Sequence, residues 1–92
     1  MSSAAPPPDA PFQYPLRYPV KVIGLAAADF VAHAVALVER AAGAPAEGAP
    51  EVKPSGGGKY LSVTVTVTLE SEARRLAIYQ ALRGDPRVVF AL

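Results

Sequence analysis

The sequence predicts an α+β sandwich in which two helices cover one face of a four-stranded antiparallel sheet. Three observations indicate this class. Apolar and hydroxyl residues alternate almost strictly over residues 59–69, which is typical of a strand with one buried and one open face. Apolar residues recur at helical spacing in residues 27–42 and 72–83. Shorter strand-like segments flank these helices and complete the order β-α-β-β-α-β.

The first strand is predicted to begin at Pro19 or just after it and to end at Gly24. Proline cannot donate a hydrogen bond to a sheet ladder, so we expect it at the start of a strand rather than inside one. Successive side chains of a strand point to opposite faces of the sheet. One face should therefore carry Val20 and Val22, and the other Lys21 and Ile23.

A helix over residues 27–42 follows, and Gly43 is a suitable C-terminal stop. His33 falls on the polar face of this helix with Asp29 and Arg40, so we expect an exposed histidine without a chemical role. The apolar stripe of the helix consists of Phe30, Ala34, Leu37, Val38 and Ala41.

The second and third strands are predicted over residues 51–55 and 59–69. Pro54 restricts the former to an edge of the sheet. The latter is the strongest pattern in the chain, and it separates a core face from an open face. The core face carries Leu61, Val63, Val65, Val67 and Leu69, and the open face carries Tyr60, Ser62, Thr64, Thr66 and Thr68.

Three glycines and a lysine between these strands raise the question of a phosphate-binding loop. Such a loop needs a glycine five positions before Gly58, where Lys53 stands, and a serine or threonine where Tyr60 stands. It also needs a helix after the loop, whereas a strand follows here. The glycines therefore predict a hairpin turn that uses positive φ angles.

The second helix should have Ser71 as its N-cap, with Glu72 in the first turn, and should end at Arg83 and Gly84. Arg75 falls within its apolar stripe. We expect the stem of Arg75 to lie along the core while the guanidinium reaches water beside Glu72. The stripe itself is predicted to consist of Leu76, Ile78, Tyr79 and Leu82.

The last strand follows Pro86, and it should place Val88, Phe90 and Leu92 on one face. Val89 would then lie on the open face with Ile23. Together the elements predict the ferredoxin-like βαββαβ sandwich, with strand order 4-1-3-2 and both helices on one face. The prolines at 54 and 86 then fall on or beside edge strands, which tolerate them.

A chain of 92 residues is long enough for one domain, which we assign to residues 14–92. Residues 1–13 are predicted to form a disordered Pro/Ala-rich tail, with a docking peptide for a proline-reading partner as the alternative. The first residues lack the basic and apolar regions of a secretory signal. No segment approaches the roughly 20 apolar residues of a membrane span, so we expect a cytoplasmic protein without membrane contact.

Composition argues against several functional classes. The net charge of +1 provides no field that would attract nucleic acid. One histidine and no cysteine leave no metal-ligand set, so we expect no metal or cofactor. The carboxylates are scattered, and no pair of them is predicted to converge in a cleft. We therefore expect a protein that is not an enzyme.

Five segments resemble the YbeD-like family of small bacterial proteins. They are YP at 14–15, KVIG at 21–24, KPSGGGKYLSV at 53–63, IYQAL at 78–82 and VVFAL at 88–92, within a match over residues 14–92. The resemblance implies a ferredoxin-like fold similar to the ACT regulatory domain and a bacterial cytoplasmic setting. The family is of unknown function, so no activity is implied. Lys21, Gly24, Pro54, Ser55, Tyr60 and Ser62 fall in its recurring motifs, and Arg75 stands where an apolar residue is expected.

Two functional hypotheses follow. The first is a non-catalytic regulatory or interaction module that binds a small-molecule effector or a protein partner, with a homodimer compatible with either. The similarity to ACT domains implies a metabolite site at the loop from Gly24 to Ala28. A partner would use a strand edge or the open face. The second hypothesis is RNA binding through Lys21, Lys53, Lys59 and Tyr60, which the single tyrosine and the low net charge do not favour. The candidate residues for a ligand or partner are Lys21, Gly24, Ser55, Lys59, Tyr60 and Ser62.

Overall fold

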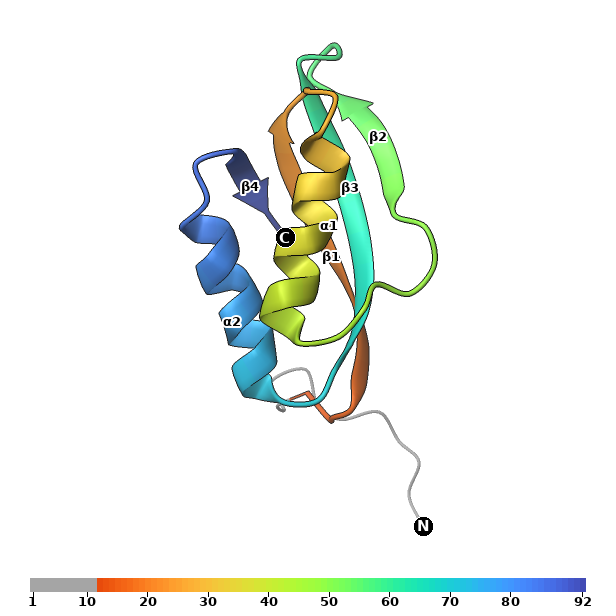
Figure 1. Ribbon diagram of the computed structural model, residues 1–92, viewed down its shortest axis with the longest axis vertical. Helices are drawn as coiled ribbons and strands as arrows, with labels where there is room; N and C mark the ends of the chain where they lie inside the picture. The colour runs from red at the N-terminus through yellow and green to blue at the C-terminus, as the bar shows by residue number, and fades with distance from the viewer. Residues whose placement is uncertain (1–11) are drawn as a thin grey trace.

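The computed structural model describes residues 12–92 and has the predicted order of elements (Figure 1). All but the last two residues of the predicted tail lie outside the described residues. The first half of the domain contains β1 (Leu16–Leu25), α1 (Phe30–Ala42) and β2 (Glu51–Ser55). The second half contains β3 (Tyr60–Leu69), α2 (Glu72–Arg83) and β4 (Val88–Ala91).

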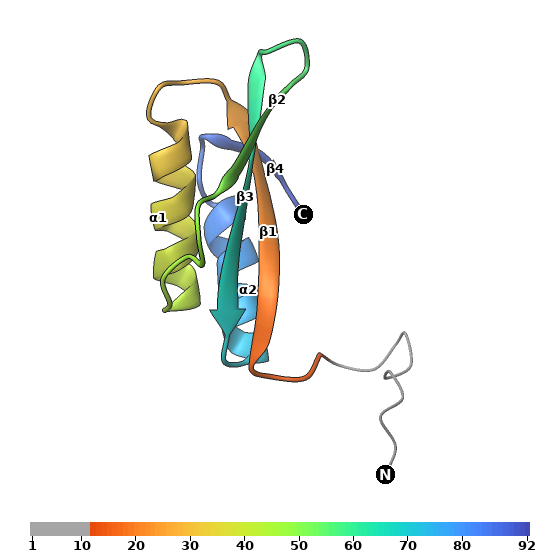
Figure 2. The same cartoon turned by 90° about the vertical axis from the view of Figure 1, so that its right-hand side faces the viewer.

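The four strands form one antiparallel sheet in the order β2-β3-β1-β4. This is the predicted order read from the opposite edge. Both helices lie on the same face of the sheet, and the other face is left uncovered by helices (Figure 2). The ferredoxin-like sandwich is therefore confirmed, with β2 and β4 at its edges.

The core lies between this sheet and the two helices. The predicted alternation of β3 holds, since Val63, Val65, Val67 and Leu69 are fully buried. From the helices, Phe30, Val38 and Ile78 are equally inaccessible to solvent. Burial of each large side chain of this kind contributes about 1.5–3 kcal/mol, so the core is the main source of stability.

Strand β1 is longer than predicted and includes Pro19. Pro19 pairs with Thr66 of β3, although we expected the strand to begin there. The main-chain groups of Lys21 point to β4, where its N–H and C=O both bond Leu92. Pro19 is two residues earlier, so its main chain faces the same side. The pairing with β4 ends at Leu92, so the missing N–H of Pro19 leaves no ladder bond unmade.

Helix α1 begins three residues later than predicted, at Phe30 rather than residue 27. Asp29 is its N-cap residue, but the Asp29 side chain makes no capping hydrogen bond. It instead accepts two hydrogen bonds from Arg87, in the loop before β4. The end of the helix is as predicted, with Gly43 in the left-handed conformation at φ 68°.

Helix α2 begins and ends as predicted, and the Ser71 hydroxyl accepts a hydrogen bond from the Arg74 N–H at 3.3 Å. The predicted burial of Leu76 is wrong, because its side chain is 48% exposed. Arg75 occupies the inward position instead. Its guanidinium reaches Glu72 at the surface, as we expected for this residue.

The prediction that Val88, Phe90 and Leu92 share one face of the last strand is also wrong. Val88 pairs with Gly24, but Phe90 pairs with Ile23 and Ala91 with Val22, because the register of β4 shifts by one residue between these pairs. Such a bulge turns the following side chains over to the opposite face. Val88 and Ala91 consequently pack against the core, whereas Phe90 and Leu92 share the open face with Ile23.

The glycine run forms the tight hairpin that the sequence predicts. Gly56, Gly57 and Gly58 have φ angles of 59°, 69° and 92°, a region that disfavours side chains. The hairpin brings Ser55 opposite Tyr60, and it sets the register between β2 and β3.

Candidate interaction surface

The uncovered face of the sheet is a surface to which all four strands contribute. In one row across it, Lys53 of β2 pairs with Ser62 of β3, Ser62 pairs with Ile23 of β1, and Ile23 pairs with Phe90 of β4. Paired residues of neighbouring strands share a face. A cation, a hydroxyl group and two large apolar side chains therefore stand side by side.

Apolar side chains gather at the β1–β4 side of this face. Leu25 is two residues beyond Ile23 on β1 and is 55% exposed, and Phe90 is exposed to the same extent. Leu92 is 57% exposed and exchanges two main-chain hydrogen bonds with Lys21, at 3.0 and 2.9 Å. These register neighbours form one surface, which we name the apolar patch: Ile23, Leu25, Phe90 and Leu92. Contiguous exposed apolar surface of this kind marks interaction sites.

Cations and hydroxyl groups border the apolar patch. Lys21 is exposed beside Leu92, and Lys59 lies at the end of the glycine hairpin with its Nζ 5.6 Å from the centroid of the Tyr60 ring. Tyr60 pairs with Leu25 across the sheet. Together with Lys53, these residues place cations around the apolar centre, and Glu51 adds one carboxylate in the row of Lys21.

Five of the six predicted candidate residues lie at this open face. Lys21, Tyr60 and Ser62 project from the two central strands, Ser55 pairs with Tyr60, and Lys59 precedes it. Ser62 is buried among its neighbours, so it contributes little accessible surface.

Gly24 belongs to the opposite face of the sheet. It is buried against the ring of Phe30, and a Cβ atom added there would lie 2.4 Å from two ring carbons and 2.5 Å from the Arg87 carbonyl oxygen. The structure therefore explains Gly24 by packing between β1 and α1.

The loop after Gly24, which the similarity to ACT domains suggests as a metabolite site, connects β1 to the start of α1. The Ala26 N–H donates to the Lys59 carbonyl, which ties this loop to the glycine hairpin. At the start of α1 the Asp29 carboxylate pairs with Arg87 Nη2 at 2.7 Å. Hydrogen bonds from Arg87 hold the pKa of Asp29 below its usual range. An anionic ligand would meet this carboxylate at the positive end of the helix.

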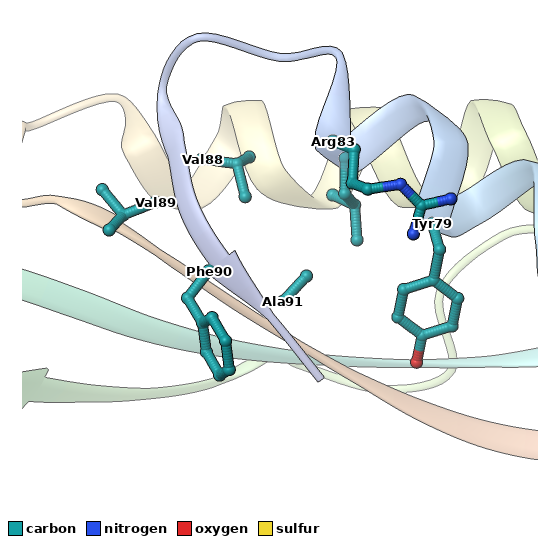
Figure 3. A pocket seen from close by; sticks show the side chains of 7 residues that line it. Tyr79, Arg83, Val88, Val89, Phe90 and Ala91 are labelled. Carbon is teal, nitrogen blue, oxygen red and sulfur yellow. The ribbon is translucent and has the colours of Figure 1, made fainter.

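A pocket of about 330 Å³ lies elsewhere, between α2 and β4 (Figure 3). From α2 it is lined by Tyr79, Leu82 and Arg83, and from β4 by residues 88–91. In Figure 3 the Phe90 ring points away from the side of β4 that carries Ala91. The pocket therefore opens on the helix side of the same strand that displays part of the apolar patch.

The predicted exposure of His33 is wrong. Its side chain is mostly buried, and Nε2 lies 2.8 Å from Asp85 Oδ2 in the loop between α2 and β4. Although burial acts to raise the pKa of Asp85, the Arg87 backbone N–H and His33 together hold it below its usual value. The contact joins the first turn of α1 to the end of α2, so we assign His33 a structural role.

A second polar cluster joins the residues before β1 to α2. Glu72 accepts hydrogen bonds from Arg75 and from the Tyr14 hydroxyl. The Tyr18 and Tyr79 hydroxyl groups lie 3.0 Å apart, and burial together with this hydrogen bond raises the pKa of Tyr79. Phe12, in the predicted tail, contacts the Tyr18 ring edge-on at a centroid distance of 5.9 Å. Every partner in this cluster is satisfied internally, which is typical of structural packing.

The sequence did not reveal the apolar patch as a whole, and it did not indicate that Arg83 lines a pocket. Phe90 and Leu92 were predicted on the core face, because periodicity does not reveal a bulge. Leu25 follows the glycine at which we expected the strand to end. The one available signal was the absence of charge and proline in the segment VVFAL, which is unusual for an edge strand.

The fold and the surface define a class: a small ferredoxin-like protein with helices on one side of its sheet and an open, partly apolar face on the other. A family model described as protein of unknown function, DUF493, matches residues 9–92. The chain belongs to this family. Its curated relatives are bacterial proteins of the UPF0250 group, so the resemblance to the YbeD-like family is confirmed.

Two of these relatives match over almost their whole length. A UPF0250 protein of Ralstonia nicotianae is 37% identical over 89 residues, covering 97% of this chain and 92% of the relative. A UPF0250 protein of Janthinobacterium sp. is 37% identical over 86 residues, covering 94% of each. Their names state no activity.

Among solved structures, the chain is similar to the solution structure of protein HP0495 from H. pylori. The TM-score is 0.71 with 23% sequence identity, and the match covers 98% of each chain. This similarity supports the fold. Neither helix in the described part of the chain is long and apolar enough to cross a membrane.

Proposed function

We propose that this protein is a non-catalytic interaction module of the bacterial cytoplasm, which binds a protein partner through the open face of its sheet. The observation that carries the proposal is the apolar patch. Four large side chains lie next to one another on a face that no helix covers, and three of them are more than half exposed. Exposed apolar surface with a polar border is typical of protein-binding sites.

The geometry favours a protein partner over a small metabolite. The described pocket lies between α2 and β4, and none of the residues that line it belongs to the loop after Gly24. The Phe30 ring packs against Gly24 and leaves no space beside it. The Asp29 carboxylate lies at the start of α1, where an anionic metabolite would have to bind. An exposed apolar surface on an open sheet suits another protein surface better than a ligand that needs to be enclosed.

The test compares two variants that remove exposed apolar side chains from different places. Ile23→Ser/Phe90→Ser changes the apolar patch, whereas Leu76→Ser removes a similarly exposed side chain from α2. Each purified protein is immobilised and incubated with nuclease-treated bacterial lysate, and bound proteins are quantified by mass spectrometry. We expect specific partners on the wild type and on Leu76→Ser, and their loss from the double variant. Equal recovery on all three would contradict the proposal.

RNA binding is the second candidate, and one observation favours it. The register of β4 places a second aromatic ring, Phe90, on the face that already carries Tyr60. Aromatic rings on an open sheet with nearby lysines can stack bases. The discriminating measurement is fluorescence anisotropy of labelled single-stranded RNA at low and high salt. RNA binding predicts an affinity that falls steeply with salt and is reduced by Phe90→Ser.

A further inference from the structure

The two edges of the sheet differ in how they are protected. Strand β2 carries Glu51, Lys53 and Pro54, and charges and proline are the features that keep an edge strand from pairing with another chain. Strand β4 contains only Val88, Val89, Phe90 and Ala91, with no charge and no proline. Val89 is 58% exposed. The β4 edge therefore has the composition of a strand that is normally covered.

The main chain of β4 has groups directed to the free edge. Lys21 and Leu92 exchange both of their main-chain hydrogen bonds. Hydrogen-bonded and non-hydrogen-bonded pairs alternate along an antiparallel ladder. The neighbouring pair, Val22 and Ala91, is consequently of the second kind. The N–H and C=O of Ala91 therefore point away from β1, where a further strand would bond them.

An added strand would have one face towards the open side of the sheet and one towards the helix side, and β4 offers a surface on each. On the open side lie Phe90 and Leu92, and on the helix side lies the pocket formed with α2 (Figure 3). Arg83 lines this pocket and is exposed, and among residues 12–92 no carboxylate lies within ion-pair distance of it. A carboxylate entering the pocket would find a cation available for a charge-assisted hydrogen bond.

We propose that an extended segment of a partner protein adds to β4 as a fifth strand. Its main chain bonds Ala91, its apolar side chains on one face cover Phe90 and Leu92, and an acidic side chain on the other face reaches Arg83. This inference rests on the proposed function, because it specifies how a protein partner would engage the apolar patch. In such strand addition, main-chain bonds give affinity and alternate side chains give specificity.

Charge distinguishes this partner from a second copy of the chain. Paired about a two-fold axis, two β4 strands would face each other with the same apolar residues. Strand β4 offers no carboxylate for Arg83. The two Arg83 side chains of such a dimer would approach the same edge with like charge. An acidic, alternating segment from another protein is the better complement.

The experiment begins with a displayed library of random ten-residue peptides, selected against the full-length protein. Synthetic peptides from the selection are then titrated into the wild type and into three variants. Arg83→Glu reverses the charge in the pocket, and Arg40→Glu makes the same change on α1. Ala91→Pro removes the outward N–H without removing a bond to β1.

We expect selected peptides in which apolar residues alternate with a position that holds Asp or Glu. Arg83→Glu should weaken their binding about tenfold or more, as expected for loss of a hydrogen bond between charged groups. Arg40→Glu should leave binding unchanged, and Ala91→Pro should abolish it. Amide hydrogen exchange provides a readout that needs no variant, because a bound strand should slow exchange of the Ala91 N–H in the wild type.

Three outcomes would overturn strand addition, and they separate it from the proposed function. Peptides whose binding is unchanged in Ala91→Pro, which leave Ala91 exchange fast and which fail to bind the Ile23→Ser/Phe90→Ser protein, titrated alongside, would bind the open face alone. That result preserves the proposed function. Failure to select any peptide against the intact protein would exclude a partner strand at this edge. A dimer with a slowly exchanging Ala91 amide in the absence of peptide would assign the edge to a second copy.

Discussion

Arg75 and Glu72 form a two-point contact across one turn of α2, in which Arg75 Nε donates to Oε1 at 2.9 Å and Nη2 donates to Oε2 at 2.6 Å. Hydrogen bonds from Arg75, and then from the Tyr14 hydroxyl, lower the pKa of Glu72 from 4.5 to about 2. The contact explains how an arginine is accommodated within an apolar stripe. Its guanidinium is neutralised at the edge of the core while Leu76 turns outward.

This contact predicts a specific dependence of stability on pH. The pKa of Glu72 is lower in the folded state, so its contribution is fully present above about pH 4.5 and is lost as the pH falls towards 2. Glu72→Gln should lower the Tm at neutral pH and flatten its decline in acid. Thermal unfolding followed by circular dichroism over a pH series measures both effects. Parallel pH profiles for the two proteins would contradict the assignment.

Gly24 should tolerate no side chain. Gly24→Ala places a Cβ atom 2.4 Å from the Phe30 ring and 2.5 Å from the Arg87 carbonyl oxygen, so the helix or the strand must shift. We expect a loss of about 1–3 kcal/mol in the free energy of unfolding, as for other overpacked sites. Gly84→Ala is the matched control, because its nearest contact would be an ordinary 3.5 Å. Urea denaturation of both variants decides whether close packing explains Gly24.

Two apolar residues of α2, Ile78 and Leu76, should differ sharply in their contribution to the free energy of unfolding. Ile78 is fully buried, so Ile78→Ala should cost about 2–5 kcal/mol by leaving a cavity. Leu76 is about half exposed, and Leu76→Ala should change the free energy of unfolding by no more than about 0.5 kcal/mol. Chemical denaturation of the two single variants measures the difference. Similar costs would mean that Leu76 faces the core after all.

The contact between His33 and Asp85 should be detectable as an energetic coupling. Single and double substitutions of His33 and Asp85 to alanine form a double-mutant cycle. We expect a coupling free energy of about 0.5–1.5 kcal/mol, as for a partly buried hydrogen bond. Protection of neighbouring amides in the first turn of α1 should fall in the same variants. A coupling of zero would mean that the 2.8 Å contact contributes nothing to docking of α1 on the α2–β4 loop.

Much of the fold could be predicted, because the strongest patterns in the chain are local. The alternation of β3 needs only a period of two, and the hairpin needs only three glycines. Pro19 misled the prediction of β1, because whether a proline disrupts a ladder depends on where the neighbouring strand ends. The prediction for Arg75 was correct, whereas Leu76 was wrongly placed in the buried stripe, because Arg75 takes the inward position and pairs with Glu72 at the surface.

The candidate surface was only partly predictable. Alternation alone places Lys21, Tyr60 and Ser62 on one face, and the structure agrees. The apolar patch depends on the pairing of Ile23 with Phe90, which follows from a bulge in the backbone. The pocket at Arg83 depends on how α2 approaches β4. Neither relationship is encoded in the spacing of residues within one element.

The distribution of the tyrosines has a practical consequence for spectroscopy. The chain has no tryptophan and four tyrosines, so tyrosine provides its intrinsic fluorescence. Tyr14, Tyr18 and Tyr79 belong to the cluster at α2, whereas Tyr60 stands alone at the glycine hairpin. In a Tyr60→Phe protein, the remaining emission would report only on the seam between α2 and β1. Subtracting the emission of the variant from that of the wild type would give the emission of Tyr60 alone. This signal would report on the open side of the sheet without any attached dye.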